Sequence, residues 1–591
     1  MSYKQHSPEF KSKVALAAIK GDKSLAELSQ EFKLHLYQIS RWKQEALQKY
    51  GKPEIFNTDQ RTQYTANSFT QILEDHNTKS SMDGKGRALD KIFIERLWRT
   101  VKYEHILLWR FDSMTELRAG LKICFDRYNK NRLPKKREPL HTEVIIKKET
   151  TQTLDNLPKL PLNIEDFALL TSISAFKEEI ISQIRSAKQR IYLSALYIAN
   201  DESGNQIVEE LLSARIKNPG LDIRIFIDFH RAQRGLIGQP KQNGNIEGYA
   251  LLQQKYQSKL PIYGVPAKTT ELMGVFHVKG FVFDSTVIYS GASLNNVYLN
   301  FKNSYRLDRY FIIRNSALAD TLAAFMQSHF LDNPEAVKLL NSGSRVAIRP
   351  IRKAVKLFVR KIRQCSYAAT GQHHGLTVTP LFGFGRKNNP LNTAIVSLLQ
   401  QAKESITIYT PYFNLAPAIR RQLDQILRKS QITINIIVGD KIANDFYIQP
   451  DKPFHKIGLI PYLYEQNLRD FLKKYTPAIE TGKLNVYLWK DGTNTYHQKG
   501  LEIDDCYRLL TGHNLNSRGW NLDMENGLLI SDHEQKLSAL FKDEFAQTMK
   551  NCQKISSYTE IDTVNDYPRL IKSYIKRFRL IKLDLLIKKI I

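Results

Sequence analysis

Cysteine is scarce in this sequence, and long apolar runs are missing from it. The four cysteines are spread over 591 residues without a CxxC pair or a Cys/His cluster: Cys124, Cys365, Cys506 and Cys552. We therefore expect neither a disulfide framework nor a bound metal ion. The first residues lack the apolar stretch of a secretory signal, and no apolar run reaches the roughly 18 residues that span a bilayer. These absences favour a cytoplasmic protein without a membrane-spanning helix.

Positive charge, by contrast, is in large excess. The chain carries 87 Lys and Arg against 59 Asp and Glu, a formal net charge of +28. Such an excess indicates a polyanionic partner, either nucleic acid or an anionic membrane surface. An apolar content of 42% and an aromatic content of 10% are those of a globular protein, and the length allows about three to four domains.

Residues 1–50 are predicted to form three short helices. The first begins at Ser7-Pro8, the second at a capping box formed by Ser24 and Glu27, and the third contains Trp42. Three helices of this length with a basic third helix are typical of a helix-turn-helix that reads DNA. The alternative with the same spacing is a plain helical bundle.

Two acidic residues in the next segment, Asp59 and Glu95, have 35 residues between them. With their neighbours they resemble the second Asp and the final Glu of DDE insertion-sequence transposases, whose RNase-H-like core binds two metal ions on three carboxylates. The first Asp of that set has no counterpart, because Asp22 falls among the predicted helices. We interpret residues 51–150 as a truncated, catalytically inactive fragment. The alternative is a segment with too little sheet to bury a core.

A short pattern occurs twice in the rest of the chain. The first copy is His277-Val278-Lys279 followed by Asp284, and the second is His497-Gln498-Lys499 followed by Asp504. Both copies end in the same Gly-x-[Ser/Asn]-Leu-Asn tail. Two copies with the same internal spacing indicate a duplication rather than chance.

Strands and helices alternate in the same order around both copies. A predicted helix at about 174–187 and a strand at 190–197 correspond to a helix at 391–403 and a strand at 405–410. The alternation predicts two α/β halves, each with a mostly parallel sheet covered on both faces. We expect the halves to pack about a pseudo-twofold axis and to form one active site.

The chemistry of the repeated pattern fits phosphoryl transfer. On a strand, the His and the Lys of each copy point to the same face, so packing of the halves brings both pairs into one pocket. Two Lys charges there hold a phosphate and stabilise a pentacovalent transition state. One His attacks phosphorus while the other protonates the leaving oxygen, and neither step requires a metal. The alternative for either copy alone is a surface His and Lys on an edge strand.

An attacking His needs an acceptor at its second ring nitrogen. Asp308 lies 31 residues after His277, and Glu525 lies 28 residues after His497. Their similar placement makes these two carboxylates the candidates for orienting the histidines. The predicted catalytic set is His277, Lys279, Asp284, Asp308, His497, Lys499, Asp504 and Glu525.

The duplicated pattern resembles that of the phospholipase D superfamily. Residues 158–591 further resemble the bacterial CDP-diacylglycerol–serine O-phosphatidyltransferases in the segments 228–235, 276–280, 290–298, 410–414, 439–447 and 494–497. The resemblance implies two phospholipase D-like α/β sandwich halves that transfer the phosphatidyl group of CDP-diacylglycerol to L-serine without a cofactor. It implies His277 as the nucleophile and His497 as the general acid and base, although both motifs are intact and the reverse assignment stays open.

The same resemblance implies how the substrates are held. The phosphate is expected on both Lys and on the two tails, at Ser293, Asn295, Asn514 and Asn516. Cytidine or serine is expected on two loops, at Arg231, Arg234, Asp440, Lys441 and Asn444. The alternative for the loops is a set of salt-bridged surface residues.

Three rival interpretations remain. A related enzyme with another acceptor, as in cardiolipin synthesis, lipid hydrolysis or nuclease action, has the same two motifs. A DNA-binding protein derived from a transposase would use residues 1–150. In the third interpretation, the fused N-terminal fragment prevents the enzyme from folding or from docking on a membrane.

Two basic stretches predict contact with a membrane. Residues 345–363 contain eight Lys and Arg and no acid, and residues 567–591 contain eight with only Asp584. In the second stretch, Ile571 and Ile575 belong to one apolar helical face, as in basic amphipathic helices that bind anionic surfaces. The alternative is a charged helix packed on the protein's own core. We expect peripheral association with the inner face of the cytoplasmic membrane.

These interpretations divide the chain into seven parts. The predicted parts are a helix-turn-helix at 1–50, a truncated DDE fragment at 51–150, a linker at 151–165, a first half at 166–344, a basic linker with a helix at 345–375, a second half at 376–555 and a basic amphipathic helix at 556–591.

Overall fold

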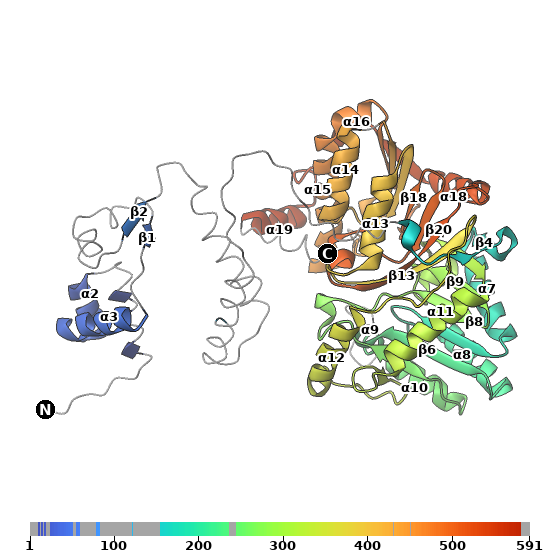
Figure 1. Cartoon of the computed structure of the whole chain (residues 1–591), viewed down its shortest axis with the longest axis horizontal. Helices are drawn as coiled ribbons and strands as arrows, with labels where there is room; N and C mark the ends of the chain where they lie inside the picture. The colour runs from blue at the N-terminus through green and yellow to red at the C-terminus, as the bar shows by residue number, and fades with distance from the viewer. Residues whose placement is uncertain are drawn as a thin grey trace. The chain divides into compact units, whose positions relative to one another are not determined.

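The structure is a computed structural model that describes most of the chain from residue 154 onward. The described residues are 24–50, 55–58, 79–82, 154–235, 244–429, 431–449 and 451–580, with a few single residues at 10–18 and residue 121. The chain divides into two compact units, residues 1–145 and 146–591 (Figure 1). Asp59, Glu95 and residues 581–591 lie outside the described residues.

The first unit contains two of the predicted helices, α2 (Leu25–Phe32) and α3 (Leu36–Tyr50). The predicted capping box is confirmed: the Ser24 hydroxyl accepts from the Glu27 N–H at 3.2 Å, and the Glu27 carboxylate accepts from the Ser24 N–H at 2.6 Å. Two short strands, β1 (Ile55–Thr58) and β2 (Lys79–Met82), pair in parallel. DNA binding by this unit stays a prediction.

The first half of the second unit is built on a sheet in which eight strands are described, in the order β12-β7-β6-β5-β8-β9-β11-β4. Its strands are β4 (Phe167–Leu170), β5 (Arg190–Ser194), β6 (Asp222–Asp228), β7 (Ile262–Val265), β8 (Gly280–Phe283), β9 (Thr286–Ser290), β11 (Tyr310–Arg314) and β12 (Lys338–Leu339).

The second half has a sheet of nine described strands, in the order β21-β16-β15-β14-β18-β19-β20-β13-β3. Its strands are β3 (Leu160–Pro161), β13 (Thr377–Phe384), β14 (Ser405–Thr410), β15 (Thr433–Gly439), β16 (Leu484–Trp489), β18 (Gly500–Ile503), β19 (Tyr507–Thr511), β20 (Met524–Ser531) and β21 (Cys552–Ile555).

Apart from β3, which has no counterpart in the first sheet, the two strand orders are the same when equivalent strands are matched, which confirms the duplicated α/β halves. In each sheet three neighbouring strands pair in parallel, β5-β6-β7 and β14-β15-β16. The other pairings within these two sheets are antiparallel. The expectation of mostly parallel sheets is therefore wrong, because β8-β9 and β18-β19 are hairpins that return beside β5 and β14.

Helices cover the outer face of each sheet (Figure 1). On the first half these are α7 (Ile173–Ser186), α8 (Glu202–Lys217) and α10 (Asn245–Lys255), which share a buried apolar core with the sheet. On the second half they are α13 (Pro390–Gln401), α14 (Pro417–Lys429) and α15 (Ile460–Lys474). The repeated helices at 174–187 and 391–403 are confirmed.

The inner faces of the two sheets meet in a common core. Tyr289 and Phe311 from the first sheet lie in one buried cluster with Val378 and Phe382 from the second. Two helices between the halves contribute to it, α11 (Ser316–Met326) and α12 (Ile348–Ile362). Five further α-helices lie in the described part of the unit: α9 (Phe229–Ala232), α16 (Thr476–Glu480), α17 (Ser517–Asn521), α18 (Ser538–Met549) and α19 (Arg569–Leu580).

Three expectations about the connecting segments change. Residues 154–165 of the expected linker are folded, because β3 extends the second sheet and Leu154 and Leu157 are buried. The apolar faces of α12 and α19 pack on the protein itself, since Val355, Phe358 and Ile575 are each at most 2% exposed, while Leu357 and Leu570 lie off these faces and are 52% and 49% exposed. These two faces are thus covered, as in the packed-helix alternative. Within the described residues, no helix has both the length and the apolar composition to cross a membrane.

Candidate active site

Both His-x-Lys segments lie just before a strand rather than within it. β8 begins at Gly280 and β18 begins at Gly500, immediately after Lys279 and Lys499. The expected strand from His277 onward therefore starts three residues later. The Asn526 side chain replaces the missing ladder partner: it accepts from the Lys279 N–H and donates to the Lys279 carbonyl, both at 2.8 Å.

Each of these segments is paired through its backbone with the other half of the unit. The His277 N–H donates to the Met524 carbonyl at 2.9 Å, and the His497 N–H donates to the Leu307 carbonyl at 2.8 Å. The short strands β10 (Arg306–Leu307) and β17 (Thr495–Tyr496) extend the second contact. The accepting carbonyls belong to the residues just before Glu525 and Asp308.

These backbone contacts place one carboxylate against each histidine. Nδ1 of His277 lies 2.9 Å from Oε2 of Glu525, and Nδ1 of His497 lies 3.0 Å from Oδ2 of Asp308. All four side chains are at least nine-tenths buried. Both contacts join opposite halves of the duplication, so neither half contains a complete His–carboxylate pair.

The two lysines face the same site. Nζ of Lys499 is 3.0 Å from Oδ2 of Asp308, and Nζ of Lys279 is 3.3 Å from the Ala292 carbonyl. Burial, followed by the charge of Lys499, lowers the pKa of Lys279 to about 7. Burial also lowers the pKa of Lys499 to about 8, although Asp308 opposes the change. Two buried cations destabilise each other until an anion lies between them.

The tail glycines let the halves approach closely. A Cβ on Gly291 would lie 2.9 Å from Nζ of Lys499, and a Cβ on Gly512 would lie 2.9 Å from Cγ of Lys279. The glycine of each copy thus faces the lysine of the other copy. A side chain at either position would displace a predicted phosphate ligand.

Both histidines are held neutral. Burial lowers the pKa of His277 well below its usual value, and Lys279 and Lys499 add to this effect. Burial and then Lys499 lower the pKa of His497 to about 3, against the opposing effect of Asp308. A neutral imidazole whose Nδ1–H donates to a carboxylate presents a lone pair on Nε2.

The side chains of Asp284 and Asp504 bind backbone N–H groups rather than residues of the candidate active site. The Asp284 carboxylate accepts from the N–H groups of Lys188, Gln189 and Arg190 at 2.8–2.9 Å. Asp504 accepts from three equivalent N–H groups, those of residues 403–405, at the same distances. Both aspartates have a positive φ, 50° and 53°, in the hairpin turns. We therefore correct their assignment as catalytic groups: they connect each hairpin to the start of β5 or β14.

Three of the predicted tail residues, Ser293, Asn295 and Asn516, are buried, and Asn514 is half-buried. Oδ1 of Asn295 accepts from the Tyr298 N–H at 3.0 Å, and Oδ1 of Asn516 accepts from the Gly519 N–H at 2.9 Å. These asparagines therefore fix equivalent turns in the two halves. Ser293 is 3% exposed, and the buried side-chain oxygen of Asn514 has no hydrogen-bond partner among the described residues.

The predicted loop residues separate into two groups. Arg231 lies 4.3 Å above the ring of Tyr197, whose hydroxyl accepts from Asn295, so this arginine borders the site. Arg234 instead forms an ion pair with Glu271, and Asp440 caps a turn by accepting from the Ile442 N–H. Arg234 therefore fits the alternative interpretation of these loops, in which their charged residues form salt bridges within the protein.

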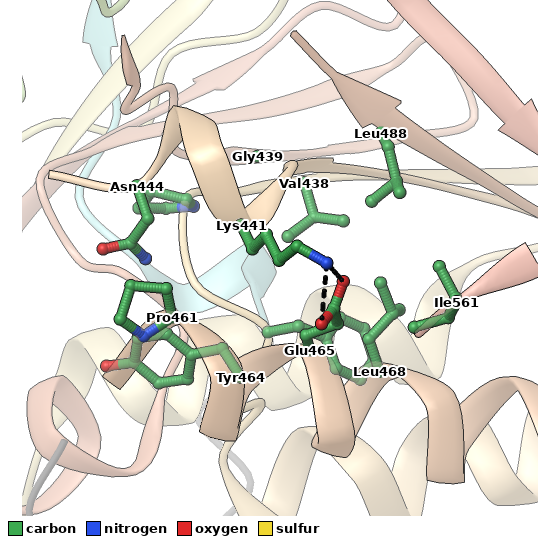
Figure 2. A pocket seen from close by; sticks show the side chains of 12 residues that line it. Val438, Gly439, Lys441, Asn444, Pro461, Tyr464, Glu465, Leu468, Leu488 and Ile561 are labelled. Atoms are coloured by element: carbon green, nitrogen blue, oxygen red, sulfur yellow. Dashed lines mark hydrogen bonds and ion pairs between the residues drawn. The ribbon is translucent and has the colours of Figure 1, made fainter. Parts of the chain in front are cut away.

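A pocket adjoins the loop at 439–445 (Figure 2). Nζ of Lys441 lies 3.0 Å from Oε1 of Glu465. Figure 2 shows this pair and Asn444 in the lining of the pocket. Asp562 is a second carboxylate partner of Lys441. Lys441 is therefore neutralised within the protein, whereas Asn444 uses its side-chain oxygen to accept from the Phe446 N–H.

Several neighbouring residues had no role in the sequence interpretation. Asp228 accepts from the Phe276 N–H at 2.8 Å and so fixes the residue before His277; burial raises the pKa of Asp228 to about 6. The Tyr298 hydroxyl lies 2.7 Å from Nδ1 of His497. Both residues belong to the segments that carry the family resemblance, but no local pattern marks them as neighbours of the histidines.

Known proteins match both halves. A family model described as "Cardiolipin synthase, PLD-like domain" matches residues 180–330 and 395–549. The CDP-diacylglycerol–serine O-phosphatidyltransferase of Haemophilus influenzae is 44% identical over 453 residues, covering 75% of this chain and 99% of that protein. The enzyme of the same name from Escherichia coli is 41% identical over 443 residues, covering 74% and 98%. The CDP-diacylglycerol–glycerol-3-phosphate 3-phosphatidyltransferase of Schizosaccharomyces pombe is 25% identical.

A solved structure has the same fold. The crystal structure of phosphatidylserine synthase from Haemophilus influenzae superposes with a TM-score of 0.71 at 43% identity, covering 74% of this chain and 98% of that one. The transposase resemblance of residues 1–150 stays an expectation. The duplicated site, the matching fold and the extent of the identity show that this chain belongs to the CDP-diacylglycerol–serine O-phosphatidyltransferase family, transferases of the phospholipase D superfamily.

Proposed function

We propose that this enzyme transfers the phosphatidyl group of CDP-diacylglycerol to L-serine and releases CMP and phosphatidylserine. The observation that carries the proposal is the reciprocal pair of contacts, His277 with Glu525 and His497 with Asp308, around two buried lysines. This arrangement supplies a nucleophile, a proton carrier and a cationic phosphate site. The names of the most similar relatives supply the substrates.

The reaction proceeds in two displacements. In the first, Nε2 of His277 forms a bond to the phosphatidyl phosphorus, the bond to the bridging oxygen breaks, and CMP leaves. In the second, the serine hydroxyl oxygen bonds to phosphorus, its proton passes to His497, and the bond between phosphorus and His277 breaks. Lys279 and Lys499 stabilise the charge on the equatorial oxygens in both transition states.

The surroundings of the two rings support His277 as the nucleophile. Among the described residues, Nε2 of His277 has no hydrogen-bond partner, whereas Nε2 of His497 lies 3.3 Å from the Tyr298 hydroxyl. A lone pair without a donor is available for attack. The Tyr298 hydroxyl lies closer still to Nδ1 of His497, at 2.7 Å, and Asp308 contacts the same nitrogen at 3.0 Å, so this ring belongs to a hydrogen-bond network suited to proton transfer.

The lipid substrate requires contact with a membrane. The face of α12 that points away from the core carries exposed Arg349, Arg352, Lys353, Lys356 and Arg360. We propose that this basic face, rather than the covered apolar one, holds the enzyme peripherally on the inner surface of the cytoplasmic membrane. Anionic lipids contribute about 1 kcal/mol for each basic residue near the surface.

Release of CMP from CDP-diacylglycerol in detergent micelles tests the proposed reaction. The assay compares wild type, His277→Ala and the matched control His374→Ala, whose residue is exposed on the surface. EDTA is present throughout, and L-serine is added or omitted. We expect serine-dependent release with formation of phosphatidylserine in wild type and His374→Ala, and none in His277→Ala.

Two results would contradict the proposal. Release that is independent of serine and yields phosphatidic acid would indicate a hydrolase. Phosphatidyl transfer to glycerol or phosphatidylglycerol in place of serine would indicate a cardiolipin synthase or another transferase of the superfamily.

A further inference from the structure

An ion pair beside His497 has no role in the steps above. Nη1 of Arg306, on β10 of the first half, lies 3.4 Å from Oδ2 of Asp445, which follows the turn at 441–443 in the second half. Their side chains are 15% and 17% exposed. The pair is thus recessed but within reach of a small molecule.

Both charges are one side chain away from His497. The Tyr412 hydroxyl donates to Oδ1 of Asp445 at 2.7 Å, and the Tyr412 ring lies 6.0 Å from the His497 ring. Arg306 lies 5.0 Å above the ring of Tyr298, whose hydroxyl is 2.7 Å from Nδ1 of His497. The two tyrosines therefore place the ion pair next to the histidine assigned to the acceptor hydroxyl.

Aromatic packing keeps this part of the site in shape. The Tyr412 ring stacks on Tyr464 with a centroid distance of 5.3 Å and an interplanar angle of 13°. The ring of Phe446, the residue after Asp445, lies 6.4 Å from that of Tyr412 at an interplanar angle of 30°. These packed rings limit the movement of the neighbouring Asp445 carboxylate. The charges of Asp445 and Arg306 are therefore preorganised.

A nearby structural ion pair differs in every respect. Arg309 contacts Glu544 through two nitrogens, at 2.8 and 2.5 Å, and the two side chains are only 2% and 7% exposed. That geometry is bidentate and closed to water. The single 3.4 Å contact between Arg306 and Asp445 leaves oxygens and N–H groups with capacity for a further partner.

A zwitterionic amino acid has the chemistry to fill that capacity. It carries a carboxylate and an ammonium on one carbon, and a neighbouring cation and anion complement both. We propose that Arg306 binds the carboxylate and Asp445 binds the ammonium of a zwitterionic 3-hydroxy amino acid, with its hydroxyl directed to His497. The inference rests on the proposed transfer to serine and identifies the residues that select this acceptor.

The pair also rejects other acceptors. A polyol phosphate, such as glycerol 3-phosphate, has no ammonium and would place its negative charge against the Asp445 carboxylate. An amino alcohol without a carboxylate, such as ethanolamine, would leave Arg306 without its partner. Specificity in this site therefore combines attraction with repulsion.

The experiment separates acceptor binding from the first displacement. Asp445→Asn and Arg306→Lys are compared with Asp222→Asn, which breaks an Arg–Asp pair, Arg224 with Asp222, at the opposite end of β6 from Asp228. Two activities are measured: phosphatidylserine formation as a function of L-serine, and exchange of labelled CMP into CDP-diacylglycerol, which needs no acceptor. The exchange also reports that each variant is folded.

We expect Asp445→Asn to raise the KM for L-serine by about 10- to 100-fold, the effect of losing one charge-assisted hydrogen bond. CMP exchange by Asp445→Asn should stay within about twofold of wild type. The KM of Arg306→Lys for L-serine should lie between that of wild type and that of Asp445→Asn. Asp445→Asn should also reduce the preference for L-serine over 3-hydroxypropionate, which lacks only the ammonium.

Each contrary outcome has its own meaning. A serine KM that is unchanged in Asp445→Asn, or that changes equally in Asp222→Asn, overturns the acceptor site while transfer to serine stands. An equal loss of CMP exchange and transfer assigns the pair to positioning of His497 and also overturns it. A wild type that exchanges CMP but makes no phosphatidylserine overturns the proposed function and this inference together.

Discussion

Nδ1 of His277 lies 2.9 Å from Oε2 of Glu525, although 248 residues separate the two in the chain. The equivalent contact joins His497 to Asp308 at 3.0 Å, across 189 residues. Each half thus supplies one histidine and the carboxylate that orients the histidine of the other half. Such a site forms only when both halves are folded and docked against each other.

The identity of the nucleophile is the first prediction. With CDP-diacylglycerol labelled in the phosphatidyl phosphate, we expect His497→Asn to accumulate label on the protein after a rapid quench at alkaline pH. His277→Asn should acquire no label, because it lacks the attacking nitrogen. Both variants should lose about 10²- to 10⁴-fold in turnover, as expected when a general acid or base is removed. Label on His277→Asn and none on His497→Asn would reverse the two roles.

Glu525→Gln tests the orienting carboxylate. The amide keeps the size of the side chain but has no charge, so it holds the His277 ring less firmly in the Nδ1–H tautomer. We expect kcat to fall by about 10²-fold or more while the KM for CDP-diacylglycerol changes little. Asp308→Asn should raise that KM as well, since Asp308 also contacts Lys499. An unchanged kcat for Glu525→Gln would show that the contact does not assist the reaction.

The two low lysine pKa values predict a pH profile. The pKa of Lys279 is about 7 and that of Lys499 about 8 in the free enzyme, so both lose their charge as the pH rises through these values. We expect kcat/KM for CDP-diacylglycerol to fall between pH 7 and 8.5 at saturating serine. Bound phosphate favours the charged lysines, so kcat should fall only at higher pH. A kcat/KM that is flat from pH 6 to 8.5 contradicts the assignment.

Asp284→Ala distinguishes a structural from a reacting aspartate. The change removes the acceptor for three backbone N–H groups and places Ala at a positive φ, so we expect about 1–3 kcal/mol lower stability to unfolding. The folded fraction should keep a kcat within a few-fold of wild type. Asp424→Ala, which breaks an exposed pair with Lys474, serves as the control and should cost at most about 1 kcal/mol. Loss of kcat in a stable Asp284→Ala protein would restore its catalytic assignment.

Charge reversal on α12 tests the membrane proposal. The triple variant Arg352→Glu, Lys356→Glu and Arg360→Glu should bind vesicles containing phosphatidylglycerol at least 10²-fold more weakly, given about 1 kcal/mol per basic residue. Sedimentation with the vesicles at two salt concentrations measures this binding. The matched control reverses three exposed arginines of α14: Arg420, Arg421 and Arg428. Equal losses in both variants would indicate general attraction by net charge rather than docking through α12.

Local signals in the sequence were sufficient for much of the fold. The capping box at Ser24 and the helices at 174–187 and 391–403 were predicted correctly, because caps and apolar periodicity depend on neighbours along the chain. Strand direction was predicted wrongly, since the pattern of one strand does not show which way its neighbour runs. The start of β8 after Lys279 was also missed, because the partner of that segment is the distant side chain of Asn526.

The candidate site shows the same division. Spacing alone predicted the two histidines and two lysines, and the quasi-equivalent positions predicted Asp308 and Glu525. It did not show that the carboxylates are exchanged between the halves. It also grouped Asp284 and Asp504 with the reacting residues, because a constant spacing is produced equally by a hairpin turn and by a shared active site.

The sequence by itself therefore determined the duplication, the kinds of residue in the site and the family. The tertiary structure decided which histidine meets which carboxylate, and that Arg306 and Asp445 meet beside His497. It also decided that the apolar faces of α12 and α19 are covered. The reason is physical: repeats and local spacing are written along the chain, whereas these contacts form only when two sheets pack face to face and bring distant loops together.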